Sequence, residues 1–330
     1  MTRTRSIRAI AAATVVILLV AACSSSGGST APSKAAAKTY KDLTVGFIQT
    51  GSEGGWRAAN TASFKDEATK LGITLKFYDA QNKQENQLSA FRQFIADDSV
   101  DVIVLAALEA AGWDQVLKEA KDKGKIVVLE DRRIDADPAL YATYIGSDFT
   151  LEGRKAADEM CTLLKDSAKK NVVELVGNVG SSAAIDRGKG FRENMGKCGI
   201  VVTESQTADW ATDKGKSVTA AFLQKSKDIQ GVFAQNDEMG LGAVQALTEA
   251  GLKPGTDVKV ITVDATKGAF QAMIAGTVNT VVECNPLLAV QVYEAALKAA
   301  NGETLPKWVP TIEGVFYQKD AATILPSRTY

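Results

Sequence analysis

The sequence predicts an α/β fold in two lobes, each built on a sheet of mostly parallel strands. Short β-rich runs alternate with helical patterns over residues 43–302, and several of the runs are apolar at every position. Strands that are apolar on both faces are typical of parallel sheets covered by helices on both sides. Short connections between alternating strands and helices imply right-handed crossovers. A length of 330 residues suits two domains of ordinary size.

Composition indicates a globular chain and narrows its chemistry. Hydrophobic residues make up 45% of the chain and charged residues 23%, and the net charge is −1 without a basic block. The chain can therefore bury cores, and it lacks the charge pattern of a nucleic-acid binder. Histidine is absent, which excludes hydrolases that depend on a histidine base and zinc sites with histidine ligands.

The N-terminal segment is expected to lie outside the fold. Three arginines precede an uncharged run at 9–22, which is too short to span a bilayer but has the length of a signal-peptide core. The run ends in LVAAC at 19–23, which resembles the cleavage box of bacterial lipoproteins. We expect a signal peptide at 1–22, a lipidated Cys23 and a flexible tether at 23–41. Cleavage takes the net charge from −1 to −4. The alternative is a plain secretory signal followed by a chance cysteine.

The expected elements follow in order along the chain. Nine candidate strands are Thr44–Gln49, Thr74–Asp79, Val102–Ala106, Ile126–Glu130, Val172–Gly177, Ile200–Thr207, Gly231–Ala234, Val258–Val263 and Val278–Glu283. Helical patterns at Trp56–Leu71, Thr150–Ser167 and Glu238–Ala250 lie between them. A strand-like segment, YATYIGSD at 141–148, marks the break between the two sheets.

Polar and aromatic residues gather where the predicted strands end, which is where open parallel sheets bind their ligands. They are Gln49, Glu53, Trp56 and Arg57 after the first strand, Asp131 and Arg132 after the fourth, and Arg187, Trp210, Asn236 and Asp264 in the second half. Carboxylate, amide and guanidinium groups grip vicinal hydroxyls, and an indole ring covers the C–H face of a sugar. The sequence predicts a monosaccharide site without a metal or cofactor.

Several of these residues have an ordinary structural alternative. Asn236 and Asp264 stand at positions where helix N-caps occur. For Arg132, the alternative interpretation is a solvated side chain on the surface. For Trp56, the alternative interpretation is an indole ring buried in the hydrophobic core. Trp113 and Trp308 are expected in the core, and Arg133 is expected to be solvated. The loop GNVGSS at 177–182 resembles a phosphate cradle but lacks the Gly-Lys-Ser/Thr ending.

Six segments together resemble one family: VGFIQTGSEGGWRAAN, DAQNKQENQ, VLEDRRID, NVVELVGNVGSSAAIDRGKGF, AQNDEMGLGAVQALTEAGLKPG and TVDAT. They are similar to the periplasmic sugar-binding proteins of ABC importers, in the ribose/galactose-binding class of type I periplasmic binding proteins. The galactofuranose-binding members are the most similar. The resemblance implies two Rossmann-like, hinge-linked lobes. It divides them as residues 42–148 plus 284–312 and residues 149–283 plus 313–330.

The same resemblance implies a receptor rather than an enzyme. The chain would be anchored outside the cytoplasm by lipid alone, act as a monomer, capture a galactofuranose- or galactose-like sugar and pass it to the importer's permease. It implies that Glu53, Trp56 and Arg57 line the first lobe, with Gln49 at the edge. Cys284 stands where the ribose-binding members place a glutamine near the sugar, so an identical pentopyranose mode is not expected.

Two further questions stay open at the level of sequence. Apart from Cys23, the chain has three cysteines; Cys161 and Cys198 are the candidate disulfide pair, and three free thiols are the alternative. The functional alternatives are a receptor for another pentose or hexose, the sensor domain of a repressor, and a secreted carbohydrate-active enzyme. An enzyme would need two facing carboxylates, such as Asp131 with Asp264 or Glu53.

Overall fold

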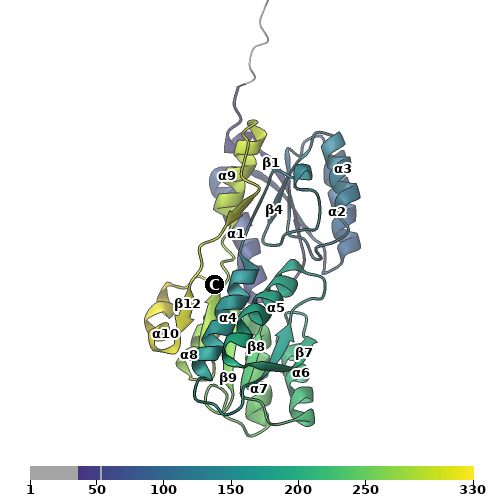
Figure 1. Cartoon of the computed structure of the whole chain (residues 1–330). Coiled ribbons are helices and arrows are strands. Elements are labelled where there is room, and N and C mark those ends of the chain that lie inside the picture. Colours follow the sequence, from purple (N-terminus) through teal and green to yellow (C-terminus); the bar gives the residue numbers. More distant parts are fainter. Residues whose placement is uncertain (1–35, 53) are drawn as a thin grey trace, which may run out of the picture. The chain divides into compact units, whose positions relative to one another are not determined.

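The computed structural model describes residues 36–52 and 54–330, and within them the chain forms two six-stranded sheets (Figure 1). The predicted signal peptide, Cys23, most of the predicted tether and Glu53 lie outside the described residues. Lys38, inside the predicted tether, already contacts the fold, because its ammonium group pairs with Asp101 and its backbone N–H donates to Asn301. No described helix is long and apolar enough to cross a membrane.

The first sheet consists of parallel strands in the order β11-β5-β4-β3-β1-β2. Their bounds are β1 Thr44–Gln49, β2 Thr74–Asp79, β3 Val102–Leu105, β4 Ile126–Glu130, β5 Thr143–Gly146 and β11 Trp308–Pro310. The helices of this part of the chain are α1 Gly55–Leu71, α2 Gln84–Ala96, α3 Asp114–Asp122 and α9 Ala289–Ala300.

Side-chain alternation explains why β3 is apolar at every position. Val102 and Val104 of β3 face a core shared with α1 and α9. Ile103 and Leu105 of the same strand face a second core shared with α2 and α3. Since successive side chains point to opposite faces of a strand, a strand between two helical layers needs an apolar residue at every position.

The second sheet has the order β12-β10-β9-β8-β6-β7, parallel except for β12, which runs antiparallel to β10. Its strands are β6 Asn171–Val176, β7 Val201–Thr207, β8 Gly231–Ala234, β9 Lys259–Asp264, β10 Thr280–Glu283 and β12 Val315–Tyr317. The helices of this part are α4 Phe149–Leu163, α5 Ser182–Met195, α6 Thr212–Lys225, α7 Asp237–Glu249, α8 Lys267–Ile274 and α10 Gln318–Ile324.

The chain passes between the sheets through three crossover segments, residues 147–148, 284–288 and 311–314. Helix α9 follows a strand of the second sheet but packs on the first (Figure 1). Strand β11 then closes one edge of the first sheet, and β12 returns to the second. Each sheet is therefore completed by residues from the last quarter of the chain.

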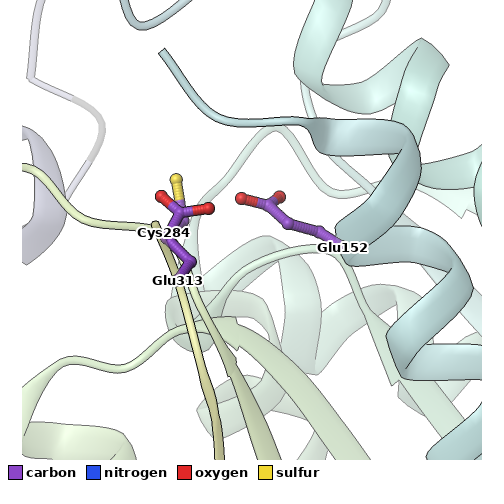
Figure 2. A group of neighbouring side chains, drawn as sticks. All are labelled: Glu152, Cys284 and Glu313. Carbon is purple, nitrogen blue, oxygen red and sulfur yellow. The ribbon is translucent and has the colours of Figure 1, made fainter. Parts of the chain in front are cut away.

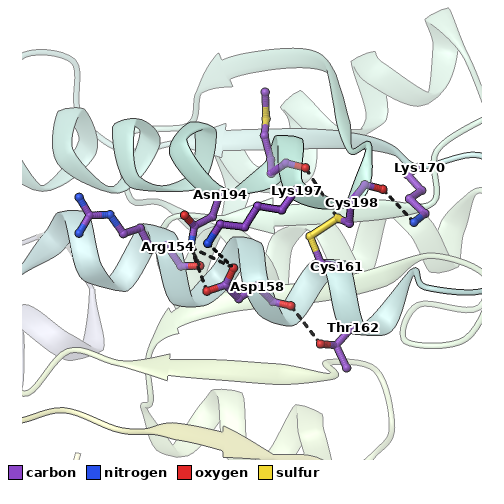
Figure 3. Close-up of a disulfide and its surroundings, with 9 residues drawn as sticks. Arg154, Asp158, Cys161, Thr162, Lys170, Asn194, Lys197 and Cys198 are labelled. Carbon is purple, nitrogen blue, oxygen red and sulfur yellow. Dashed lines mark hydrogen bonds and ion pairs between the residues drawn. A yellow bond between two sulfur atoms is a disulfide. The ribbon is translucent and has the colours of Figure 1, made fainter.

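A disulfide joins Cys161 near the end of α4 to Cys198 in the 3₁₀ turn after α5, with the Cα atoms 5.7 Å apart (Figure 3). The two helices pack closely, because a Cβ at Gly153 or at Gly190 would overlap the backbone of the other helix. The remaining described cysteine, Cys284, is a buried free thiol.

The sequence-based expectations differ from the structure mainly at the edges of the sheets. Beyond the nine expected strands and the strand-like segment that became β5, the described chain contains β11 and β12, each of three residues. The 3.6-residue and two-residue periodicities need longer segments to be recognised. Trp308, expected in the core, lies on the edge strand β11 and is 43% exposed, whereas Trp113 is fully buried as expected.

Candidate functional site

One cavity lies where strand ends of both sheets face each other. The space between its atoms amounts to about 340 Å³, open solvent at the mouth included. Eight of the ten residues that the sequence singled out line it: Trp56, Arg57, Asp131, Arg132, Arg187, Trp210, Asn236 and Asp264. Ala183 and Cys284 complete the lining.

On the side of the first sheet, two arginines flank one carboxylate. Asp131 follows β4, and its carboxylate accepts a hydrogen bond from the Arg57 guanidinium at the start of α1. The Arg132 Nε atom lies 3.6 Å from the same Asp131 oxygen. All three side chains are at most 5% exposed, so Arg132 is not the solvated residue of the alternative interpretation. Charged groups held in this way are rigid donors and acceptors for a polar ligand.

Trp56 is positioned from both parts of the chain. Its indole N–H donates to the Cys284 carbonyl oxygen at 2.7 Å, and the Arg57 guanidinium lies 4.6 Å from its ring centroid. The ring therefore bridges the start of α1 and the crossover segment 284–288. It is 7% exposed and still lines the cavity, so the core and cavity interpretations hold together.

On the side of the second sheet, Arg187 is the central cation. The sequence suggested a loop here, but Arg187 lies in α5, one turn after Ala183 and one turn before Phe191 on its buried face. Its Nε atom donates to Glu152 at 2.6 Å and its Nη1 atom to the Gln235 carbonyl at 2.7 Å. Its Nη2 atom lies 3.7 Å from the Asp264 carboxylate. Burial raises the pKa of Asp264 well above its usual range, while Arg187 acts in the opposite direction.

Trp210 contributes its indole ring to the cavity lining. The side chain is 4% exposed, and its Nε1 atom has no hydrogen-bond partner among the described residues. The guanidinium groups of Arg132 and Arg187 each lie 5.7 Å from the ring centroid. Gly177 makes room for the indole, because a Cβ there would overlap the ring. The indole ring and the two guanidinium groups therefore form one continuous part of the cavity lining.

Asn236 performs the capping role and still reaches the cavity. Its Oδ1 atom accepts from the Met239 backbone N–H at 2.9 Å and so caps α7. Its Nδ2 group donates to the Trp210 carbonyl at 3.1 Å and to Glu238 at 3.0 Å. Asp264, in contrast, is not a cap, because Thr266 accepts the capping bond of α8.

Three cavity residues have backbone angles that side-chain-bearing residues seldom adopt. The φ angles are 59° for Asp131, 63° for Trp210 and 127° for Asp264. Asp131 directly follows β4, Asp264 ends β9, and Trp210 lies three residues after the end of β7. Such positive φ angles cost free energy and are found where a site fixes side chains in place.

The structure does not bring every predicted residue to the cavity. Gln49 is buried behind it, where its amide donates to Asn60 at 2.8 Å and its Oε1 atom accepts from the Thr50 backbone N–H at 2.9 Å. It is not among the lining residues, because its strand position points it toward α1. Glu53 lies outside the described residues.

Arg133 differs from a second expectation: it was expected to be solvated, and it forms an ion pair instead. Its Nε and Nη2 atoms pair with the two carboxylate oxygens of Asp186 on α5 at 2.7 and 2.9 Å. The residue follows β4 of the first sheet, so this ion pair joins the two parts of the chain. The Gly55 backbone N–H donates to Glu238 at 2.6 Å and makes a second such contact.

Sequence reasoning missed Glu152, which lies behind Arg187. Figure 2 shows its carboxylate pointing from α4 toward Cys284 and Glu313, which come from two crossover segments. One side-chain atom of each of these three residues lies within 4.8 Å of the others. The signal was present in the sequence: Glu152 precedes Ala156 and Met160 at helical spacing on the buried face of α4.

A two-sheet α/β chain with three crossovers and a polar cavity at the strand ends defines the class of type I periplasmic binding proteins. Residues 45–304 match the family of periplasmic binding protein domains, and the chain belongs to this family.

Three similar proteins are informative. The chain is 45% identical over 287 residues to the galactofuranose-binding protein YtfQ of Escherichia coli, covering 85% of this chain and 89% of that protein. A Mycobacterium smegmatis structure in complex with β-D-fucofuranose has a TM-score of 0.85 and 45% identity, covering 87% of this chain and 95% of the other. The arabinose ABC transporter component of Shewanella, bound to α- and β-L-arabinofuranose, has a TM-score of 0.83 and 42% identity, covering 87% and 96%.

Proposed function

We propose that this protein is an extracytoplasmic receptor that captures a five-membered-ring monosaccharide of the galactofuranose type and delivers it to an ABC importer. The carrying observation is the cavity lining, in which buried charged side chains from both sheets stand beside two indole rings: Arg57, Asp131, Arg132, Arg187, Asp264, Trp56 and Trp210. The hydroxyl groups of a sugar can hydrogen-bond to such charged groups, and an indole ring can cover its C–H face. The family membership of residues 45–304 supports the location and the transport role.

The remaining lining fits a ligand with many hydroxyl groups. Carboxylates and guanidinium groups alternate around the cavity, with Asp131 between Arg57 and Arg132, and Asp264 beside Arg187. Hydroxyl groups donate to the carboxylates and accept from the guanidinium groups at the same time. An apolar ligand would displace water from these buried polar groups without offering them hydrogen bonds in return, which is unfavourable.

The preference for a furanose is supported by similar proteins. Two structures more than 40% identical to this chain hold fucofuranose and arabinofuranose, and the Escherichia coli relative binds galactofuranose by its name. Receptors for another pentose or hexose of similar size are the alternative.

Capture proceeds by closure of two lobes about the crossover segments. We assign residues 42–148 plus 284–312 to the first lobe and residues 149–283 plus 313–330 to the second. Arg133 with Asp186 and Gly55 with Glu238 join the lobes at the rim of the cavity. Hinge closure of this kind traps the ligand between the lobes. Cys23 carries the lipid anchor that keeps the monomeric receptor near its permease.

The proposal is tested in two steps: a thermal-unfolding screen for sugars that stabilise the protein, and then calorimetry to measure the Kd of those that do. Purified protein is screened by thermal unfolding against galactose, arabinose, fucose, ribose and fructose, and against methyl β-galactofuranoside and methyl β-galactopyranoside as a matched pair. We expect the furanoside to raise the melting temperature and to bind at about micromolar Kd or tighter, about −8 kcal/mol. Binding of the pyranoside alone would overturn the furanose preference, and no shift with any sugar would overturn the proposed function.

The carbohydrate-active enzyme is the less favoured alternative. Its two carboxylates would be Asp131 with Asp264 or Glu53. Asp131 is paired with Arg57 and Asp264 lies beside Arg187, whereas Glu53 lies outside the described residues. Incubation with a nitrophenyl galactofuranoside tests this alternative directly, and we expect no release of nitrophenol.

A further inference from the structure

We propose that Glu152 is a positioning residue that ties the ligand-facing Arg187 to the crossover segments through a proton shared with Glu313. This inference rests on the proposed function, since it concerns how the same cavity holds its ligand. Glu152 does not line the cavity and contacts it only through Arg187, whose Nε atom donates to Glu152 Oε2 at 2.6 Å.

The second carboxylate oxygen of Glu152 is the starting point. Glu152 is 1% exposed, and Oε1 has no hydrogen-bond partner among the described residues. The carboxylate points toward Glu313 and Cys284 (Figure 2), and the facing atoms of all three lie within 4.8 Å of one another. Two ionised carboxylates at this separation repel each other, and one proton between them removes the repulsion.

Glu313 is held as the acceptor of that proton. Its Oε1 atom accepts from the Ser147 hydroxyl, from the Thr311 hydroxyl at 2.8 Å and from the Asn285 backbone N–H at 2.9 Å. These donors belong to all three crossover segments. Donors of this kind stabilise the ionised form of an acceptor, so the proton is placed on Glu152. Glu152 then connects the sugar-binding cation to every segment that must bend when the lobes move.

The electrostatic surroundings agree with a neutral Glu152. Burial raises the pKa of Glu152 to about 8, Arg187 lowers it and Glu313 raises it further. The titratable and charged groups that face this cluster are Arg187, Asp264, Cys284, Glu313, Tyr144 and, through the Glu313 carbonyl oxygen, Lys155. Burial also raises the pKa of the Cys284 thiol well above its usual range, which disfavours the thiolate that a metal ion would require.

The sign of the pH dependence follows from this geometry. The ordinary pKa of a glutamic acid is 4.5, and that of the buried Glu152 is about 8. When the lobes open, water reaches the cluster and the pKa returns toward the ordinary value, so closure takes up a proton. The favourable contribution of protonated Glu152 to the free energy of lobe closure is complete below the lower of the two pKa values. It is lost as the pH rises to about 8.

The experiment compares sugar affinity of the wild type, Glu152→Gln and Glu152→Ala at pH 6.0 and pH 8.5, with Glu159→Gln as control. Glu159 lies on the same helix and bonds to the Tyr317 hydroxyl, so its variant should follow the wild type. We expect wild-type affinity to fall about fivefold or more between the two pH values. Glu152→Ala should bind about tenfold or more weakly at both, since Arg187 loses its acceptor.

Glu152→Gln is the conservative rescue, because its amide oxygen accepts from Arg187 and its N–H₂ group donates to Glu313. This variant should recover most of the sugar affinity lost in Glu152→Ala. Its sugar affinity should lack the part of the pH dependence that comes from Glu152. Wild-type affinity for Glu152→Ala, or a pH profile of Glu152→Gln parallel to the wild type, would overturn the proposal.

Two further measurements keep this proposal separate from the proposed function. Thermal unfolding without sugar should show the wild type losing stability relative to Glu152→Gln as the pH rises from 6.0 to 8.5. If the wild type binds no sugar, the proposed function fails while this comparison still decides the role of Glu152. If zinc chloride raises the melting temperature of the wild type but not of Cys284→Ala or Glu152→Gln, the cluster holds a metal and the shared proton is wrong.

Discussion

Arg187 illustrates how one side chain joins the ligand cavity to the interior. Its three nitrogen atoms face a carboxylate, a backbone carbonyl and the cavity carboxylate Asp264. The sequence identified the residue as a strand-end cation but not as a helical one, because the loop before α5 is rich in Gly, Ser and Ala and obscures where the helix begins. Glu152 was missed since a single acidic residue on a helix is ordinarily solvated.

Arg187→Ala tests the cation directly. Removing the guanidinium leaves Glu152, Asp264 and the ligand without their donor in a buried place. Sugar affinity measured by calorimetry should fall by about 2–4 kcal/mol. Arg154→Ala is the control, because Arg154 pairs with Glu193 on an exposed face. Affinity of Arg187→Ala within threefold of the wild type would place the ligand elsewhere.

Gly177→Ala tests the position of the Trp210 ring. A Cβ at Gly177 overlaps the indole, so the ring must shift away from its place between Arg132 and Arg187. We expect a changed tryptophan emission spectrum and a loss of affinity of roughly tenfold or more, about 1.4 kcal/mol. Gly196→Ala is the matched control, since nothing lies within 4 Å of an added Cβ there and its φ of −66° suits alanine. An unchanged spectrum in Gly177→Ala would contradict the packing described.

At the scale of elements, the pair α4 and α5 carries Glu152 and Arg187 and is held together at its far end. The disulfide Cys161–Cys198 spans 37 residues, and close backbone contact at Gly153 and Gly190 sets the spacing of the helices. The two thiols could be proposed as partners from their places late in one helix and just past the next. Their spatial distance could not be derived, because it depends on how the helices cross.

The double variant Cys161→Ala/Cys198→Ala should be less stable by about 3–4 kcal/mol, since the unfolded chain gains the freedom of a 37-residue loop. Chemical unfolding of the double variant and the wild type measures the difference. A reducing agent should lower the stability of the wild type alone. Equal unfolding midpoints for the two proteins would show that the bond contributes nothing.

Edge strands show what local sequence leaves undetermined. Strands β1 to β4 have four to six residues each and were located within one residue of their observed ends. β11 and β12 have three residues each, and their pairing depends on the crossover segment between them. These two strands form because they pair with β5 and β10. Such pairings between distant residues cannot be predicted from a short segment of sequence.

At the scale of the whole molecule, the two sheets meet through a few contacts around the cavity. Ala110 donates its backbone N–H to the Gly180 carbonyl at 2.8 Å, beside the Arg133–Asp186 ion pair. The α/β class, the division into two sheets and the position of the candidate site at the strand ends all follow from the sequence pattern and from the general rules for crossover connections. Which residues touch across the sheets, such as Arg133 with Asp186, does not.

Asp186→Asn should speed ligand release, because the closed arrangement loses a contact between the two parts of the chain. Arg133 is partly exposed, so water and salt screen the pair and the expected rise in release rate is only about two- to fourfold. Stopped-flow measurements at 50 and 500 mM NaCl check this, and salt should erase the difference. The reversed pair Arg133→Asp/Asp186→Arg should restore the slower rate. A twentyfold effect, or none at low salt, would mean that the ion pair has another role.

The late return of the chain to its first sheet has a consequence for how the molecule is made. Helix α9 supplies Val292, Tyr293 and Ala296 to a core that begins with Val45 and Phe47, and β11 adds the last strand only at residues 308–310. During synthesis, the first part therefore lacks one covering helix and one edge strand until almost the whole chain has emerged. The earliest segment of the chain therefore cannot complete its core while later residues are still being made. Contacts of such long sequence separation also make folding slow.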